Sequence, residues 1–244
     1  MRLKNTIHSL VSPKYRRKRK ELNAVLDFAE NLIEINNSNE CDFGGKKDNS
    51  AIFSYIKHIC DVINTNNTFR IIKEKCENKT YILEDDILFG DTPNKSDIIS
   101  PFKVYLGKDP VISSAKDFGK MEYVFKHIGG NGVPWQEDKI NQSYRLIMPL
   151  GITFVEEGNH SIETGIIKCV GSLSFDKSKY NCSVFDISPL YQQIYFDGIY
   201  YRTIRNNEIV EKTEFEYGCL FEIGRLLSLQ TDIQFKEKII SSSK

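Results

Sequence analysis

Apolar side chains recur at helical spacing through the first part of the chain. Residues 14–36 carry them about every 3.6 positions, which predicts an amphipathic helix with apolar positions Leu22, Val25, Leu26, Ala29, Leu32 and Ile33. Residues 50–64 repeat the pattern and predict a second helix that ends at Asn66-Asn67. The segment between them, 37–49, is rich in Asn, Ser, Gly and Lys and is typical of a loop.

The pattern changes near residue 100, where short β-prone runs begin. The stretches 69–72 and 81–83 fit either strands or short helical turns. Beyond 100 we expect strands at 102–106, 144–148 and 152–155, and helices at 115–128, 161–171 and 215–230. This order predicts an α+β protein with a mainly helical segment at 1–100 and a mixed domain of sheet and helix at 101–240.

The C-terminal part predicts a β-meander. The runs 193–196 and 199–202 flank Asp197-Gly198, a dipeptide typical of a type I′ hairpin turn, in which both central residues have positive φ. Asn206-Asn207 offers a second turn before another short β-prone run.

Composition is that of an ordinary globular protein. Hydrophobic residues make up 40% of the 244, and 33 basic residues balance 33 acidic ones. A net charge of zero argues against a surface tuned throughout to nucleic acid. The run 14–20 is locally basic, and it predicts either a solvated helix face or a contact with nucleic acid or an acidic partner.

Cysteine spacing and hydropathy indicate a cytoplasmic protein that is not embedded in a membrane. None of the six cysteines forms a Cys-x-x-Cys pair, so no zinc site is predicted, and we expect mostly buried thiols in a reducing compartment. The first residues do not resemble a signal peptide. The longest nearly apolar run, 146–155, is too short to cross a bilayer.

The most informative stretch is the turn Gly158-Asn159-His160-Ser161, where a strand gives way to a helix. Helix N-termini expose unpaired amides that bind anions, so Gly158, Asn159 and Ser161 are candidate phosphate-binding residues. Asn159 and Ser161 also suit a purely structural role as helix N-caps. Both interpretations are compatible with the sequence.

His160 and Glu163 are the candidate catalytic pair. They are three residues apart in the predicted helix, so they share a face, and the carboxylate would orient the imidazole. His160 and Ser161 are adjacent and point apart, which excludes a nucleophile–base pair. The acids at 84–86 and 156–157 have no evident partner and are interpreted as surface charge.

A glycine-rich loop at 129–135 precedes this turn. Its amides could cradle phosphate, with Asn131 and Trp135 as ligand contacts, although the loop lacks the Lys-Ser/Thr of a P-loop. The alternative is a helix stop with Trp135 as a core anchor.

Together these motifs resemble a known superfamily. A strand followed by Gly-x-His and a helix is similar to the signature turn of the ParB/sulfiredoxin-like superfamily, over roughly 100–190. In that superfamily the turn binds nucleotide phosphates and carries an arginine where this chain has Ser161. Two sequence segments more closely resemble an uncharacterised bacterial and phage family: Pro149-Leu-Gly-Ile152 and Glu157-Gly-Asn-His-Ser-Ile162.

The resemblance implies a nucleotide- or nucleic-acid-binding protein, with phosphohydrolase or nuclease activity centred on His160 as one possibility. Loss of the arginine removes a bidentate phosphate clamp, so binding is easier to defend than hydrolysis. The alternative is a non-enzymatic interaction or regulatory module, phage- or defence-linked, whose turn is structural. The sequence names no cofactor and no oligomeric state.

Overall fold

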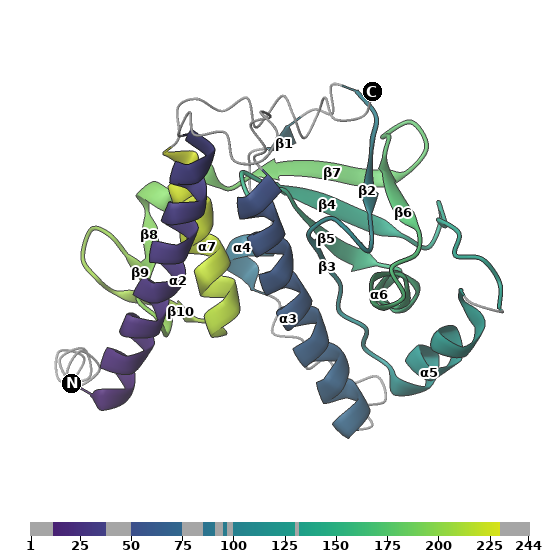
Figure 1. Ribbon diagram of the computed structural model, residues 1–244, viewed down its shortest axis with the longest axis horizontal. Coiled ribbons are helices and arrows are strands. Elements are labelled where there is room, and N and C mark those ends of the chain that lie inside the picture. The colour runs from purple at the N-terminus through teal and green to yellow at the C-terminus, as the bar shows by residue number, and fades with distance from the viewer. Residues whose placement is uncertain are drawn as a thin grey trace. The chain divides into compact units, whose positions relative to one another are not determined.

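The computed structural model describes residues 12–37, 50–74, 85–90, 95–96, 100–129 and 132–229 (Figure 1). The chain folds into two compact units. Among the described residues, unit 1 combines those up to 52 with 188–229, and unit 2 holds those from 53 to 187. Unit 1 is therefore discontinuous along the chain. The predicted boundary near residue 100 stays a prediction.

Unit 2 is built on a mixed five-stranded sheet. The strand order is β1-β7-β4-β5-β3, with bounds β1 Lys95–Ser96, β3 Val111–Ile112, β4 Ser143–Met148, β5 Ile152–Glu157 and β7 Asn181–Asp186. β4 runs antiparallel to β5 and parallel to β7, and β3 runs parallel to β5. A separate antiparallel pair joins β2 (Phe102–Tyr105) to β6 (Ser172–Phe175).

The main core of unit 2 lies on one face of this sheet. Alternate residues of β4, β5 and β7 project to it, because neighbouring side chains on a strand point to opposite faces. Helix α6 (Asn159–Ile167) and the β2–β6 pair complete the cluster through Ile162, Ile166 and the stacked rings of Phe102 and Phe175. On the opposite face Phe154 stacks on Phe89 of the short helix α4 (Asp86–Phe89).

Helix α3 (Ser50–Glu74) is longer than predicted and does not end at Asn66-Asn67. Asn67 of that pair and Asn64 before it make tertiary contacts, and the Asn67 amide donates to the Ser114 hydroxyl at 3.4 Å. The Asn64 amide donates to the Val111 carbonyl at 2.8 Å and accepts from the Ser113 N–H at 3.1 Å. Side-chain bonds to a distant loop thus override the local turn preference of asparagine.

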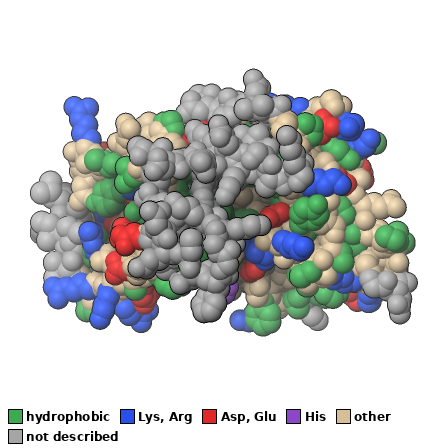
Figure 2. Space-filling model, turned by 45° about the horizontal axis from the view of Figure 1, so that its top comes forward, with side chains coloured by type: hydrophobic (Ala, Val, Ile, Leu, Met, Phe, Trp, Pro, Cys, Tyr) green, Lys and Arg blue, Asp and Glu red, His purple; other side chains and the backbone are tan. Residues whose placement is uncertain are grey.

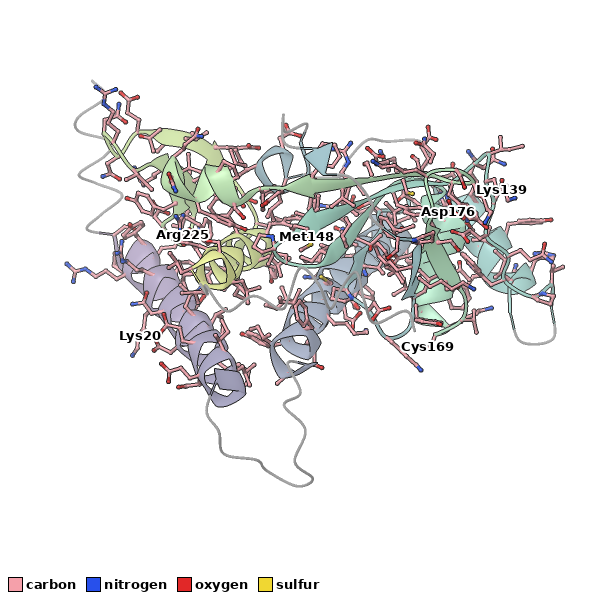
Figure 3. All side chains as sticks on the ribbon, turned by 90° about the horizontal axis from the view of Figure 1, so that it is seen from above. Lys20, Lys139, Met148, Cys169, Asp176 and Arg225 are labelled. Carbon is pink, nitrogen blue, oxygen red and sulfur yellow. The ribbon has the colours of Figure 1, made fainter. Side chains whose placement is uncertain are left out.

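Unit 1 contains helix α2 (Pro13–Asn37), helix α7 (Phe215–Ser228), a 3-10 turn at Ser188–Gln192 and a three-stranded antiparallel meander. The strands are β8 Ile194–Phe196, β9 Tyr200–Thr203 and β10 Ile209–Lys212, in the order β10-β9-β8. Two side chains of α7 bond to backbone groups of β8: Glu222 accepts from the Phe196 N–H, and Arg225, labelled in Figure 3, donates to the Ile194 carbonyl.

The turn between β8 and β9 differs from the predicted type I′ turn on Asp197-Gly198. Asp197 donates its N–H to the Tyr200 carbonyl, which makes Gly198 and Ile199 the central pair. Of these two, Gly198 has positive φ (103°), which is characteristic of a II′-like turn with glycine first. The Asp197 carboxylate accepts the N–H groups of Ile199 and Tyr200 and pairs with buried Arg202.

The predicted α+β class, the N-terminal helices and the C-terminal antiparallel strands are confirmed. The pattern did not predict β1, β3, β6 or β7, although β7 pairs with the central strand β4. Residues 81–83, and all of the predicted loop at 37–49 except residue 37, lie outside the described residues. The ParB/sulfiredoxin-like assignment stays a prediction.

Candidate functional site

The β5–α6 turn is built around Gly158. This residue has φ 81° and ψ 16° and is the N-cap of α6, which begins at Asn159 rather than at the predicted 161. A Cβ at Gly158 would lie 2.4 Å from the Gln142 Cγ and 2.9 Å from the Asn141 carbonyl oxygen. Glycine is required both by the backbone angle and by the space.

One of the two interpretations of Asn159 and Ser161 was that they cap the helix, but their side chains bond elsewhere. The Asn159 Oδ1 accepts from the Ser114 N–H at 2.8 Å, and its Nδ2 donates to the Glu156 carbonyl at 3.1 Å. The Ser161 hydroxyl donates to the Gly158 carbonyl at 3.0 Å and accepts from the Gln142 amide at 3.1 Å. Within the described residues, the first-turn amides of α6 therefore have no side-chain cap.

His160 points toward the start of helix α5 (Phe118–His127). Its Nε2 accepts the Asp117 N–H at 3.1 Å, so in the neutral ring the proton is assigned to Nδ1. Burial lowers the pKa of His160; the charge of Asp117 opposes the shift and that of Lys120 adds to it. Burial therefore favours the neutral imidazole.

Glu163 was expected to orient His160, but the structure gives it another partner. Its carboxylate is 1% exposed and accepts the Thr68 hydroxyl of α3 at 2.6 Å. Its Oε2 is buried and has no hydrogen-bond partner among the described residues. Burial raises the pKa of Glu163 to about 8. Glu163 connects α6 to α3, while the Asp117 amide orients the imidazole.

An open pocket of about 390 Å³ lies between α5 and the amino-terminal turn of α6, and we call it the α5–α6 pocket. Its lining residues are Gly119, Lys120, Tyr123, Val124, Gly158, His160 and Ser161. The α5 residues contribute one cation and an apolar wall, and the α6 residues contribute a helix N-terminus. Sequence reasoning identified the α6 half and missed the α5 half, because no local pattern shows which helix packs against the turn.

Trp135 is half-buried and packs against the main core of unit 2. Its indole N–H donates to the Ser161 carbonyl at 3.0 Å. A Cβ at Gly171 would approach the Trp135 ring to 2.4 Å, and one at Gly165 would approach the indole nitrogen to 2.9 Å. The two glycines thus make room for the indole. The other loop residue expected at the site, Asn131, lies outside the described residues.

The described residues contain no group of three or more His, Cys, Asp or Glu side chains able to hold a metal ion. Cys60, Cys182 and Cys219 are buried free thiols, and Cys169 is an exposed one. None of the helices described is both long enough and apolar enough to cross a membrane.

The comparison with family models decides the family. Residues 10–235 match the model of a family of unknown function, DUF6710. The chain belongs to this family. Family membership brings no assigned activity. A search of curated proteins and a search of solved structures found no match.

Proposed function

We propose that the α5–α6 pocket binds a nucleotide-class ligand, with its phosphate at the amino-terminal turn of α6. The observation that carries this proposal is the meeting of an uncapped helix N-terminus with Lys120 and His160 around one open pocket. The proposal concerns binding; no chemical step is assigned to the site.

The phosphate half of the site consists of backbone amides and one cation. The first-turn N–H groups of α6 point out of the helix, and the helix dipole adds about half a positive charge there. Lys120 is exposed and lines the pocket, and its charge helps to lower the pKa of His160. An oxyanion here would accept N–H bonds and pair with Lys120.

The other half of the pocket suits a base or another flat apolar group. Tyr123 and Val124 line it, and the Tyr123 ring is 64% exposed and stacks on His127 at 4.2 Å between centroids. A volume of about 390 Å³ falls within the range of roughly 300–1,000 Å³ found for small-molecule sites. A mononucleotide therefore fits better than an extended polymer.

Binding is favoured over catalysis because the polar side chains of the turn already make hydrogen bonds within the protein. Ser161 holds two hydrogen bonds, Asn159 is 8% exposed and bonds to the 113–114 loop, and the His160 Nε2 already accepts an N–H. A general base needs a free lone pair directed at the substrate. These side chains shape the turn and leave its amides for the ligand.

The test is calorimetric titration of the full chain with nucleoside mono-, di- and triphosphates. The Lys120→Glu variant should bind about ten- to a hundredfold more weakly, since a hydrogen bond to a charged group is worth roughly 1.5–3 kcal/mol. The matched control is Lys103→Glu, the same charge reversal at an exposed position of β2 that is not among the residues lining the pocket.

Equal affinity in wild type and Lys120→Glu would overturn the proposal. Failure of every nucleotide to bind at millimolar concentration would also overturn it. That result would favour the non-enzymatic interaction module, for which the internal hydrogen bonds of Asn159 and Ser161 are the supporting observation.

A further inference from the structure

The first two turns of α2 are strongly basic. Six of the seven residues from 14 to 20 are Lys14, Arg16, Arg17, Lys18, Arg19 and Lys20. Lys18 is half-buried and the other five are exposed. We call residues 14–20 the basic segment; Figure 3 labels its Lys20, and Figure 2 shows Lys and Arg side chains gathered at the lower left of the view.

Most of this charge is not neutralised within the described part of the chain. Glu21 pairs with Arg17 at 3.2 Å and with Lys18 at 2.8 Å, and its hydrogen bond to Lys18 lowers the pKa of Glu21. Arg19 bonds to the Tyr15 hydroxyl at 3.4 Å, a neutral group. One carboxylate thus serves two cations, and the basic segment keeps a clear positive excess.

The cations also lie at the end of α2 where the helix dipole disfavours positive charge. Cations at a helix N-terminus are each unfavourable by roughly 0.3–1 kcal/mol at exposed sites. The first turn of α2 has no acid and its last turn has no base, while Asp27, Glu30 and Glu34 lie in the second half. This is the reverse of the arrangement that stabilises a helix, so folding alone does not account for it.

Unit 1 holds the basic segment in place. Tyr15, Leu22 and Ala29 form a buried stripe at seven-residue intervals, each at most 4% exposed. A Cβ at Gly198 would lie 3.1–3.2 Å from the backbone of Lys18 and Arg19, so the β8–β9 turn packs closely on the helix. The cations are therefore carried on a fixed helix, which lowers the entropy cost of binding.

The distribution of the cations around the helix favours a groove over a flat surface. At about 100° per residue, the exposed basic side chains spread over roughly 220° of the circumference and about 9 Å of length. A membrane would meet one side of such a helix. It would also need exposed apolar residues for insertion, whereas Tyr15, the aromatic of this segment, is 4% exposed.

We propose that the basic segment binds duplex DNA, with the first turns of α2 in the major groove and the cations on the phosphates of both walls. An α-helix is about 10–12 Å across with its side chains, and the B-form major groove is about 12 Å wide. The narrow major groove of duplex RNA does not admit a helix. This inference is independent of the α5–α6 pocket.

The test is fluorescence anisotropy of a labelled DNA duplex with the full chain at 50–200 mM salt. The double variant Arg16→Gln/Lys20→Gln should bind at least tenfold more weakly at 100 mM salt, and the slope of log K against log salt should become shallower by about 2. Both side chains are exposed and lie at the helix end that disfavours cations, so the variant should melt at or slightly above the wild-type temperature. The matched control Lys103→Gln/Lys126→Gln removes the same charge from unit 2 and should bind like wild type.

Three results would overturn the inference. One is no binding to duplex DNA at 50 mM salt, which would make the segment a solvated face. Another is an affinity and salt slope unchanged in Arg16→Gln/Lys20→Gln. The third is co-sedimentation with phosphatidylserine vesicles, or binding to duplex RNA, in preference to DNA. Lys120→Glu should leave DNA binding unchanged, which separates this result from failure of the nucleotide proposal.

Discussion

Glu163→Gln should change how the stability of the protein depends on pH. The Glu163 carboxyl is 1% exposed, and burial raises its pKa to about 8, from an ordinary value of 4.5. Between these two pH values the folded chain keeps a proton that the unfolded chain has lost. Stability therefore falls as pH rises through this window, and it stops falling once the folded carboxyl also ionises.

The size of the effect follows from the width of the window. One proton held over one pH unit is worth roughly 1.4 kcal/mol, and the window from 4.5 to about 8 spans about 3.5 units. The upper limit is on the order of 5 kcal/mol, reached above pH 8. Glutamine keeps the acceptor for the Thr68 hydroxyl and cannot ionise. The stability of the variant relative to wild type should therefore increase steadily from pH 5 to pH 8.

The assay is urea unfolding of both proteins at half-unit steps from pH 5 to pH 9. The difference in unfolding free energy should grow with pH and level off near pH 8. Asp61, whose charge also raises the pKa of Glu163, pairs with Lys57 at 2.6 Å and is unchanged in both proteins. Glu157→Gln, the same substitution at an exposed position, is the control. A flat difference for Glu163→Gln would refute the account of a buried neutral carboxyl.

Two further predictions concern the turn itself. Gly158→Ala should lower the free energy of unfolding, measured in urea, by about 1–3 kcal/mol or more, because positive φ strains alanine and its Cβ would meet Gln142. The control Gly119→Ala, whose Cβ would meet only Asp117 at 3.5 Å, should be neutral or stabilising. An equal loss of stability in the two variants would contradict this reasoning. His160→Gln should lose less stability than wild type as pH falls below 6.5, because burial lowers the pKa of His160 and the unfolded chain then binds the proton first. If the stabilities of the two proteins changed in parallel with pH, burial would not lower the pKa of His160.

The sequence predicts the parts of the fold that local pattern encodes. The apolar repeat of α2 and the β-prone runs of β4 and β5 gave elements within a few residues of those observed. β7 was missed because its parallel partner β4 lies far away in sequence, so no turn signal marks it. Asn67 was judged by its local preference for turns, while its side chain bonds to the Ser114 hydroxyl more than forty residues away.

For the same reason, only the α6 half of the candidate site could be predicted from the sequence. Gly158 and His160 are close in sequence, and their turn can be recognised from the glycine and the residues that follow it. Lys120 and Tyr123 enter the α5–α6 pocket through the packing of α5 against α6, which no spacing shows. Glu163 shares a face with His160 in sequence, yet α3 supplies its partner in the fold.

The most direct test of the central claim is a backbone amide NMR titration with a nucleoside monophosphate. If the α5–α6 pocket binds the phosphate, the largest shifts should fall on the amides of Asn159, His160 and Ser161, followed by those from Gly119 to Val124. Shifts confined to other elements, or none at millimolar ligand, would contradict the claim.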